Sequence, residues 1–154
     1  MTTDYQKQYY KEHKDVILPR IRENQRTKYN NDLEYKLLKR YQSRIDNYFG
    51  TKIHKAEDLL KCTPEFFVNW IVWCKKDMNK SKQPWSSIEL GHVRPVSTFD
   101  NGDLSGWCWV NVYPMTEMEN LKQGNNRYLD CERKQINRVI RYLTRNNINC
   151  DHYK

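Results

Sequence analysis

The chain has 154 residues, enough for one compact domain with appendages. Hydrophobic residues make up 38% and charged residues 30%, so the core must be small, and 11 tyrosines and 5 tryptophans supply much of its buried area. No stretch approaches the roughly 18 consecutive apolar residues of a membrane span, and the first residues lack the apolar run of a secretory signal. Neither a membrane protein nor a secreted protein is expected.

The net charge of +8 lies entirely in the flanks of the chain. Residues 1–61 carry +5, residues 62–127 are neutral, and residues 128–154 carry +3. Basic flanks suit a polyanionic partner, and nucleic acid is the commonest one. A solvated surface kept soluble by lysine is the alternative.

The five cysteines are widely spaced and form no C-x-x-C pair. A zinc knuckle is therefore not expected, and the simplest account is a set of free thiols in a reducing, intracellular compartment.

The hydrophobic spacing predicts four segments. They are a basic N-terminal helical arm (1–32), a helical subdomain (33–84), a strand–loop–strand–helix segment (85–127) and a C-terminal amphipathic helix (128–154). The arm is polar and is interrupted by Pro19, so it is expected to form one or two helices of low stability.

Two helices are predicted in the second segment. Residues 33–49 place leucines, tyrosines and an isoleucine at helical spacing, and Gly50 is a natural stop. A second helix begins after Thr63, a good N-cap that is followed by a proline suited to the first helical turn. Its aromatic and aliphatic residues are expected to form core.

In the third segment the hydrophobic spacing changes from a helical pattern to a strand pattern, and in the fourth it is helical again. Short strands are predicted at 87–92 and 107–112, and a capping box at Thr116 predicts a helix from Glu117 to near Gly124. The C-terminal helix is expected to bury one face, which consists of Ile136, Val139, Ile140 and Leu143.

Three runs in the third segment carry a family resemblance. Residues 91–97 read GHVRPVS, residues 109–115 read WVNVYPM, and residues 119–127 read ENLKQGNNR. In this order they resemble the D-H-hydrophobic-x-P-x-S, N-L-x-P-L and E-N-x-K-K-G-N-K segments of HNH (ββα-metal) nucleases. Residues 59–65, LLKCTPE, resemble the lead-in helix of phage and large-DNA-virus members.

The resemblance implies an α+β, mostly helical fold with a ββα-metal hairpin and helix. It implies an endonuclease that hydrolyses DNA phosphodiester bonds with a divalent metal, Mg²⁺ or Mn²⁺, and no small-molecule cofactor. A viral or phage protein of this type would work in the host cytoplasm or nucleus, or in the virion.

The resemblance also assigns roles to individual residues. His92 would be the general base, and an ordinary histidine pKa near 6.5 suits that task at neutral pH. As a strand residue, His92 is expected to be half-exposed. Asn111 would hold the hairpin and orient the histidine, and Asn120 would bind the metal through its amide oxygen. The residues expected to contact DNA are Arg94, Lys122 and Arg127.

The main departure from the family is Gly91, where the family has an aspartate metal ligand. Mg²⁺ usually needs at least one carboxylate. Glu89 lies two residues earlier on the same side of the strand and would be the substitute ligand, or else an exposed edge charge. A strand glycine is expected to accept an aspartate side chain unless its φ is positive.

Two interpretations of function stay open at this point. One is a metal-dependent endonuclease. The other is a catalytically degenerate HNH domain that acts in DNA binding or as a structural component, for example of a virion. An RNA-binding module ranks last, because the chain has no RRM, KH or zinc-knuckle motif.

Overall fold

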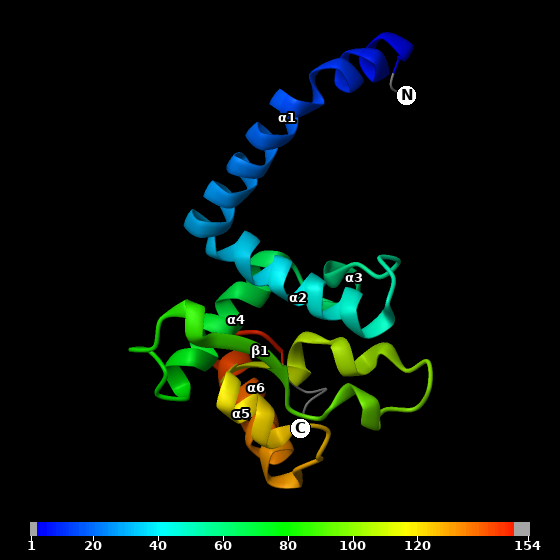
Figure 1. Cartoon of the computed structure of the whole chain (residues 1–154). Helices are drawn as coiled ribbons and strands as arrows, with labels where there is room; N and C mark the ends of the chain where they lie inside the picture. The colour runs from blue at the N-terminus through cyan, green and yellow to red at the C-terminus, as the bar shows by residue number, and fades with distance from the viewer. Residues whose placement is uncertain (1–2, 150–154) are drawn as a thin grey trace. The chain divides into compact units, whose positions relative to one another are not determined.

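The structure is a computed structural model that describes residues 3–149 (Figure 1). The chain divides into two compact units, one ending at Lys36 and the other beginning at Leu37. Its helices and strands are α1 (Asp4–Asn31), α2 (Leu33–Phe49), α3 (Ala56–Leu60), α4 (Pro64–Asp77), β1 (Ile88–His92), β2 (Val112–Thr116), α5 (Glu117–Gln123) and α6 (Leu129–Arg145). The predicted class, α+β with a helical majority, is confirmed. None of the helices in the described part of the chain has the length and apolar character that a membrane crossing requires.

The first unit consists mainly of α1. This is a single helix that continues through Pro19 and begins with a capping box, in which Thr3 and Gln6 satisfy each other's backbone N–H groups. None of its residues is buried. Its stability therefore rests on caps and on local pairs such as the stacked rings of Tyr9 and His13, whose centroids are 4.2 Å apart.

In the second unit, α2 forms as predicted and turns one face inward. Leu37, Tyr41 and Ile45 lie four residues apart on this face and are buried. The helix ends before Gly50, whose φ of +66° is a backbone conformation that glycine adopts without strain.

The helix α4 also begins where the sequence predicts. The Thr63 hydroxyl accepts a hydrogen bond from the Phe66 N–H at 3.2 Å, and Pro64 occupies the first turn. Phe67 and Trp70 are fully buried, which confirms that this helix forms core.

The sheet is a two-stranded antiparallel hairpin in which Gly91 pairs with Tyr113. The first strand is confirmed, but the second strand predicted at 107–112 is wrong. Residues 104–107 and 109–111 form 3-10 turns, and β2 begins only at Val112. In a strand, Trp107 and Trp109 would face the same side. The turns instead let Trp107 contact α2 and Trp109 contact α4.

The outer edge of β1 is closed by arginines of α2. The Arg40 guanidinium donates to the Ile88 carbonyl at 2.7 Å, and the Arg44 guanidinium donates to the Leu90 carbonyl at 2.8 Å. A two-stranded sheet has two such edges, and buried carbonyls without donors are costly. These arginines therefore serve the fold rather than a solvent-exposed surface.

The outer edge of β2 is closed in the same way. The Trp70 indole donates to the Val112 carbonyl at 2.9 Å, and the buried Lys80 ammonium donates to the Pro114 carbonyl at 3.2 Å. The N–H and C=O of one strand residue point the same way, so the N–H that proline lacks would lie on this outer edge. Pro114 consequently costs the hairpin no ladder hydrogen bond.

The capping box at Thr116 is present, and α5 ends before Gly124, as predicted. The buried face of α6 agrees with the prediction at Val139 and Leu143 but not at Ile136. Ile136 is 51% exposed, whereas Gln135, Val139 and Leu143 are buried. The Gln135 amide donates to the Val110 carbonyl at 2.9 Å. This hydrogen bond aligns the helix, because a buried amide needs a partner while a lone isoleucine tolerates solvent.

The face assignment of α6 gives a direct stability prediction. Gln135→Ala leaves the Val110 carbonyl without its donor and should lower the free energy of unfolding by about 1–3 kcal/mol. Ile136→Ala removes a mostly exposed side chain and should change it by less than about 0.5 kcal/mol. Urea denaturation of both variants measures this, and the reverse ranking would contradict the orientation of α6.

Candidate functional site

The residues singled out in the sequence come from β1, from the loop before β2, from α5 and, for Arg127, from the segment between α5 and α6. In Figure 1 the sheet lies between α2 and α5. Strand residues alternate between faces, so His92 faces α2 while Glu89 and Gly91 face α5. Contacts agree with this division, since His92 meets Tyr41 of α2 and Glu89 meets Asn120 of α5.

His92 is buried, with 5% of its surface exposed. Its Nε2 lies 3.2 Å from the Tyr41 hydroxyl oxygen, and that hydroxyl donates its proton to the Trp107 carbonyl at 2.7 Å. Because the single hydroxyl proton is already used, Nε2 carries the imidazole proton and donates to Tyr41. The edge of the imidazole also packs against the Trp107 ring, with centroids 4.8 Å apart.

This environment changes the acid–base character of His92. Burial, reinforced by the positive charge of Arg44, lowers the pKa of the imidazole from 6.5 to about 3. The expected half-exposed histidine with an ordinary pKa is therefore wrong. The strand places this side chain against the aromatic rings of Tyr41 and Trp107, where a charged imidazolium would lose its hydration.

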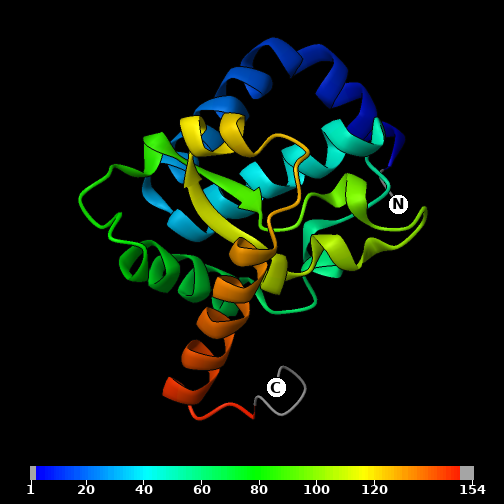
Figure 2. The ribbon, with the colours of Figure 1, turned by 90° about the horizontal axis from the view of Figure 1, so that it is seen from below.

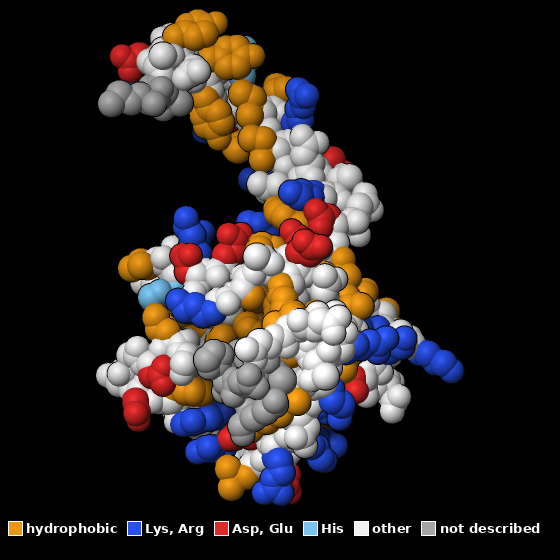
Figure 3. Space-filling model, turned by 180° about the vertical axis from the view of Figure 1, so that it is seen from behind, with side chains coloured by type: hydrophobic (Ala, Val, Ile, Leu, Met, Phe, Trp, Pro, Cys, Tyr) orange, Lys and Arg blue, Asp and Glu red, His pale blue; other side chains and the backbone are white. Residues whose placement is uncertain are grey.

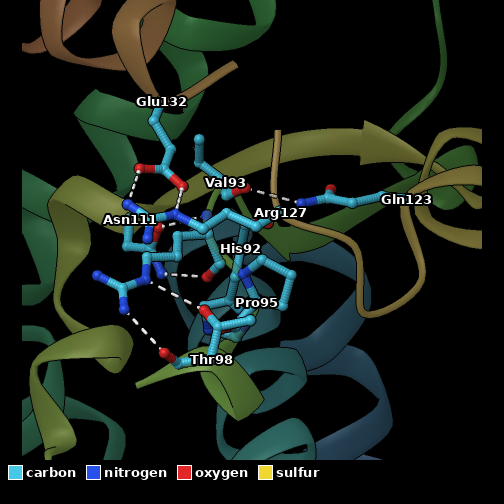
Figure 4. Close-up of polar contacts among 9 residues, drawn as sticks. His92, Val93, Pro95, Thr98, Asn111, Gln123, Arg127 and Glu132 are labelled. Carbon is cyan, nitrogen blue, oxygen red and sulfur yellow. Dashed lines mark hydrogen bonds and ion pairs between the residues drawn. The ribbon is translucent and has the colours of Figure 1, made fainter. Parts of the chain in front are cut away.

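Asn111 joins the two ends of the loop between the strands (Figure 4). Its Oδ1 accepts from the Arg94 N–H at 2.8 Å, and its Nδ2 donates to the carbonyls of Arg94 at 2.9 Å and Gly106 at 2.8 Å. The Asn111 carbonyl also accepts from the Val93 N–H at 2.9 Å. One side chain thus satisfies three backbone groups, two on Arg94 and one on Gly106.

Sequence reasoning missed Gln123, the last residue of α5. Its Nε2 donates to the carbonyls of His92 and Val93, both at 2.8 Å, and Figure 4 shows the side chain directed at the end of β1. The contact ties α5 to the hairpin. Nothing in a polar residue at a helix end signals this role.

Glu89 and Asn120, the two expected metal ligands, lie next to each other. Asn120 Nδ2 donates to Glu89 Oε2 at 2.8 Å, so the amide turns its N–H rather than its oxygen toward the carboxylate. One carboxylate and one neutral amide are few ligands for Mg²⁺. Within residues 3–149 no three or more His, Cys, Asp or Glu side chains are grouped as metal ligands. As arranged, these residues do not fit the divalent-metal site that the family resemblance implies.

With Met115 in its present position, Gly91 has no room for a side chain. A Cβ atom built there would lie 2.1 Å from Met115 Sδ and 2.8 Å from Met115 Cγ, and Met115 is fully buried. An aspartate at position 91 therefore requires the buried Met115 side chain to shift. The obstacle is the Met115 side chain on the neighbouring strand and not the backbone conformation.

Two of the three residues expected to contact DNA are engaged within the protein. The Arg94 guanidinium donates to Thr98 Oγ1 at 3.1 Å and lies 4.0 Å from the centre of the Phe99 ring. Arg127 makes a two-point ion pair with Glu132, at 2.6 and 2.9 Å (Figure 4). Lys122 is exposed on α5.

No protein-family model matches the chain, and searches of curated proteins and of solved structures give no match either.

The buried histidine predicts a specific pH dependence of stability. Between pH 6.5 and pH 3 the unfolded chain binds a proton at His92 that the folded chain does not, so acid favours unfolding. The free energy of unfolding should fall by about 1 kcal/mol between pH 7 and pH 5.5 from this group alone. His92→Phe should remove that part of the slope, whereas His13→Phe, at an exposed position on α1, should keep it. Chemical denaturation at several pH values tests this, and equal slopes in wild type and His92→Phe would contradict the burial.

The position of Met115 predicts how an aspartate at position 91 would change the stability of the protein. Gly91→Asp should lower the free energy of unfolding by about 1–3 kcal/mol or more, because the core is overfilled. Adding Met115→Ala to this variant removes the obstructing atoms. The double variant should then lose less stability than the two single changes together, as a double-mutant cycle can measure. Strict additivity would show that Met115 is not the obstacle.

Proposed function

We propose that this chain is an HNH-like ββα domain that binds DNA without cutting it. The observation that carries this proposal is the position of His92. The residue matched to the family's general base is buried between Tyr41 and Trp107, and its pKa is about 3.

General-base catalysis needs a nitrogen that reaches the attacking water and a pKa near the working pH. His92 meets neither requirement in this structure. Its Nε2–H is directed at the Tyr41 hydroxyl, and the remaining ring is enclosed by core side chains. On the opposite face of the sheet, Gly91 supplies no carboxylate and Met115 fills the space that one would need.

Other features of the structure support the resemblance. The order strand, loop, strand and helix is present, and Asn111 bridges the loop from the position matched to the family's central asparagine. A strand–loop–strand–helix order together with a buried His92 supports a binding or structural role better than hydrolysis.

The charge of the chain supports DNA as the partner. Its net charge is +8, and α1 carries seven basic and four acidic residues with no residue buried. Figure 3 shows lysine and arginine side chains spread over the lower half of one face of the molecule. Contacts of this kind recognise the phosphate backbone and are largely independent of base sequence.

A metal-dependent endonuclease is the second candidate, and one observation favours it. Glu89 and Asn120, which come from β1 and α5, are in contact at 2.8 Å beside the Gly91 position. This candidate requires the Asn120 amide to turn over and His92 to leave its buried position. Both changes act against hydrogen bonds that the structure contains.

The proposal is tested by measuring DNA binding and cleavage on the same preparation. Affinity for duplex DNA, measured by fluorescence anisotropy, should fall steeply with salt, because each neutralised phosphate releases counterions. Deleting residues 1–31 should weaken binding to unrelated sequences alike and should reduce the salt slope. Supercoiled plasmid should not be nicked in Mg²⁺ or Mn²⁺.

Two outcomes would contradict the proposal. An affinity that does not change with salt would remove the electrostatic basis of DNA binding. Nicking that is lost in both Glu89→Gln and His92→Ala would replace the proposal with the endonuclease, since a positioned base contributes about 10²–10⁴-fold to the rate.

A further inference from the structure

A pocket of about 390 Å³ lies among α5, α6 and β2 in the second unit. Lys122 comes from α5, Lys134 and Arg138 come from α6, Tyr113 comes from β2, and Tyr128 immediately precedes α6. This volume falls within the range of small-ligand sites. None of the candidate catalytic residues lines it.

The charges around the pocket favour an anion. Arg138 is held by Asp77 at 3.2 Å, and the carboxylate of Glu119, which also lines the pocket, is paired with Lys80 at 2.6 Å. Lys122 and Lys134 are exposed and have no carboxylate partner in the part of the chain that the structure describes. Two lysine ammonium groups are therefore available to a phosphate group.

The remaining wall offers neutral groups and an aromatic face. Burial raises the pKa of Tyr113 to about 12, so its hydroxyl stays protonated at neutral pH and can donate. Its present partner, Gln123 Oε1, is 3.3 Å away, which is a long hydrogen bond that a ligand would readily replace. Tyr128 is 44% exposed, so part of its ring is open to a planar group.

We propose that this pocket binds one unpaired nucleotide of the bound DNA, with its phosphate between Lys122 and Lys134 and its base against Tyr128. The inference rests on the proposed DNA-binding function and adds a preference for DNA structure to it. A base within a duplex is stacked on both faces and cannot meet an aromatic wall. A base in a single-stranded overhang can.

The test compares a fluorescently labelled blunt duplex with the same duplex carrying a short single-stranded thymidine overhang, both bound by the full chain at one salt concentration. The overhang should bind about tenfold more tightly, as expected for one base stacked on an aromatic ring. Tyr128→Leu should abolish the preference, and Tyr128→Phe should keep it because the ring remains.

The contribution of Lys134 to the overhang preference is tested against a control variant that removes the same charge outside the pocket. Lys134→Gln should reduce the preference for the overhang severalfold, whereas Lys82→Gln, which removes an exposed lysine outside the pocket, should leave the preference unchanged. Lys134 is exposed, so this variant should fold even if Tyr128→Leu does not.

The outcomes separate this inference from the function on which it rests. Salt-dependent binding of both duplexes with equal affinity would overturn the nucleotide pocket and leave the DNA-binding function standing. Lack of affinity for either duplex would overturn both. Binding of free thymidine 5′-monophosphate, without affinity for either duplex, would also overturn both and would assign the pocket to a free nucleotide.

Discussion

The structure of the second unit depends on closing both edges of a sheet that has only two strands. Such a sheet cannot shield its outward carbonyls by adding further strands, and an isolated hairpin is marginally stable in water. Side chains from two helices and a loop supply the missing donors. Arg40 and Arg44 of α2 close β1, while Trp70 of α4 and Lys80 close β2. Each hydrogen bond also fixes one helix or loop against the hairpin.

Closing the hairpin edges with helix side chains constrains the chemistry that the hairpin can perform. Placing α2 against β1 encloses His92 between Tyr41 and Trp107, and the guanidinium of Arg44 that closes the strand also disfavours a charged imidazole. The same packing that stabilises the hairpin therefore withdraws the histidine from solvent. On the other face, Met115 fills the space beside Gly91, so a buried methionine stands where a metal-binding carboxylate would need room.

The positive charge of the chain has two separate uses. Some cations are engaged within the fold, such as the buried Lys80 and the half-buried arginines of α2, and they donate to the outward carbonyls of the hairpin. Others are exposed, such as Lys122 and Lys134, and are open to an external anion. A net charge alone does not distinguish these uses. The hydrogen-bond and ion-pair partners of each cation do distinguish them, and they exclude Lys80, Arg40 and Arg44 from the surface proposed to meet DNA.

The sequence by itself determined features that depend on neighbouring residues. The start of α4 at Thr63, the capping box at Thr116 and the stop of α2 at Gly50 are set within one helical turn, so local patterns sufficed. The tertiary structure alone decided the start of β2, the burial of Gln135 rather than Ile136 on α6, and the environment of His92. Each depends on a partner distant in sequence: tryptophans that must reach two different helices, a carbonyl that Gln135 must satisfy, and a helix whose tyrosine covers the imidazole. Hydrophobic periodicity records that a residue is buried, but it does not record against what, and the chemistry of a buried histidine is set by its neighbours.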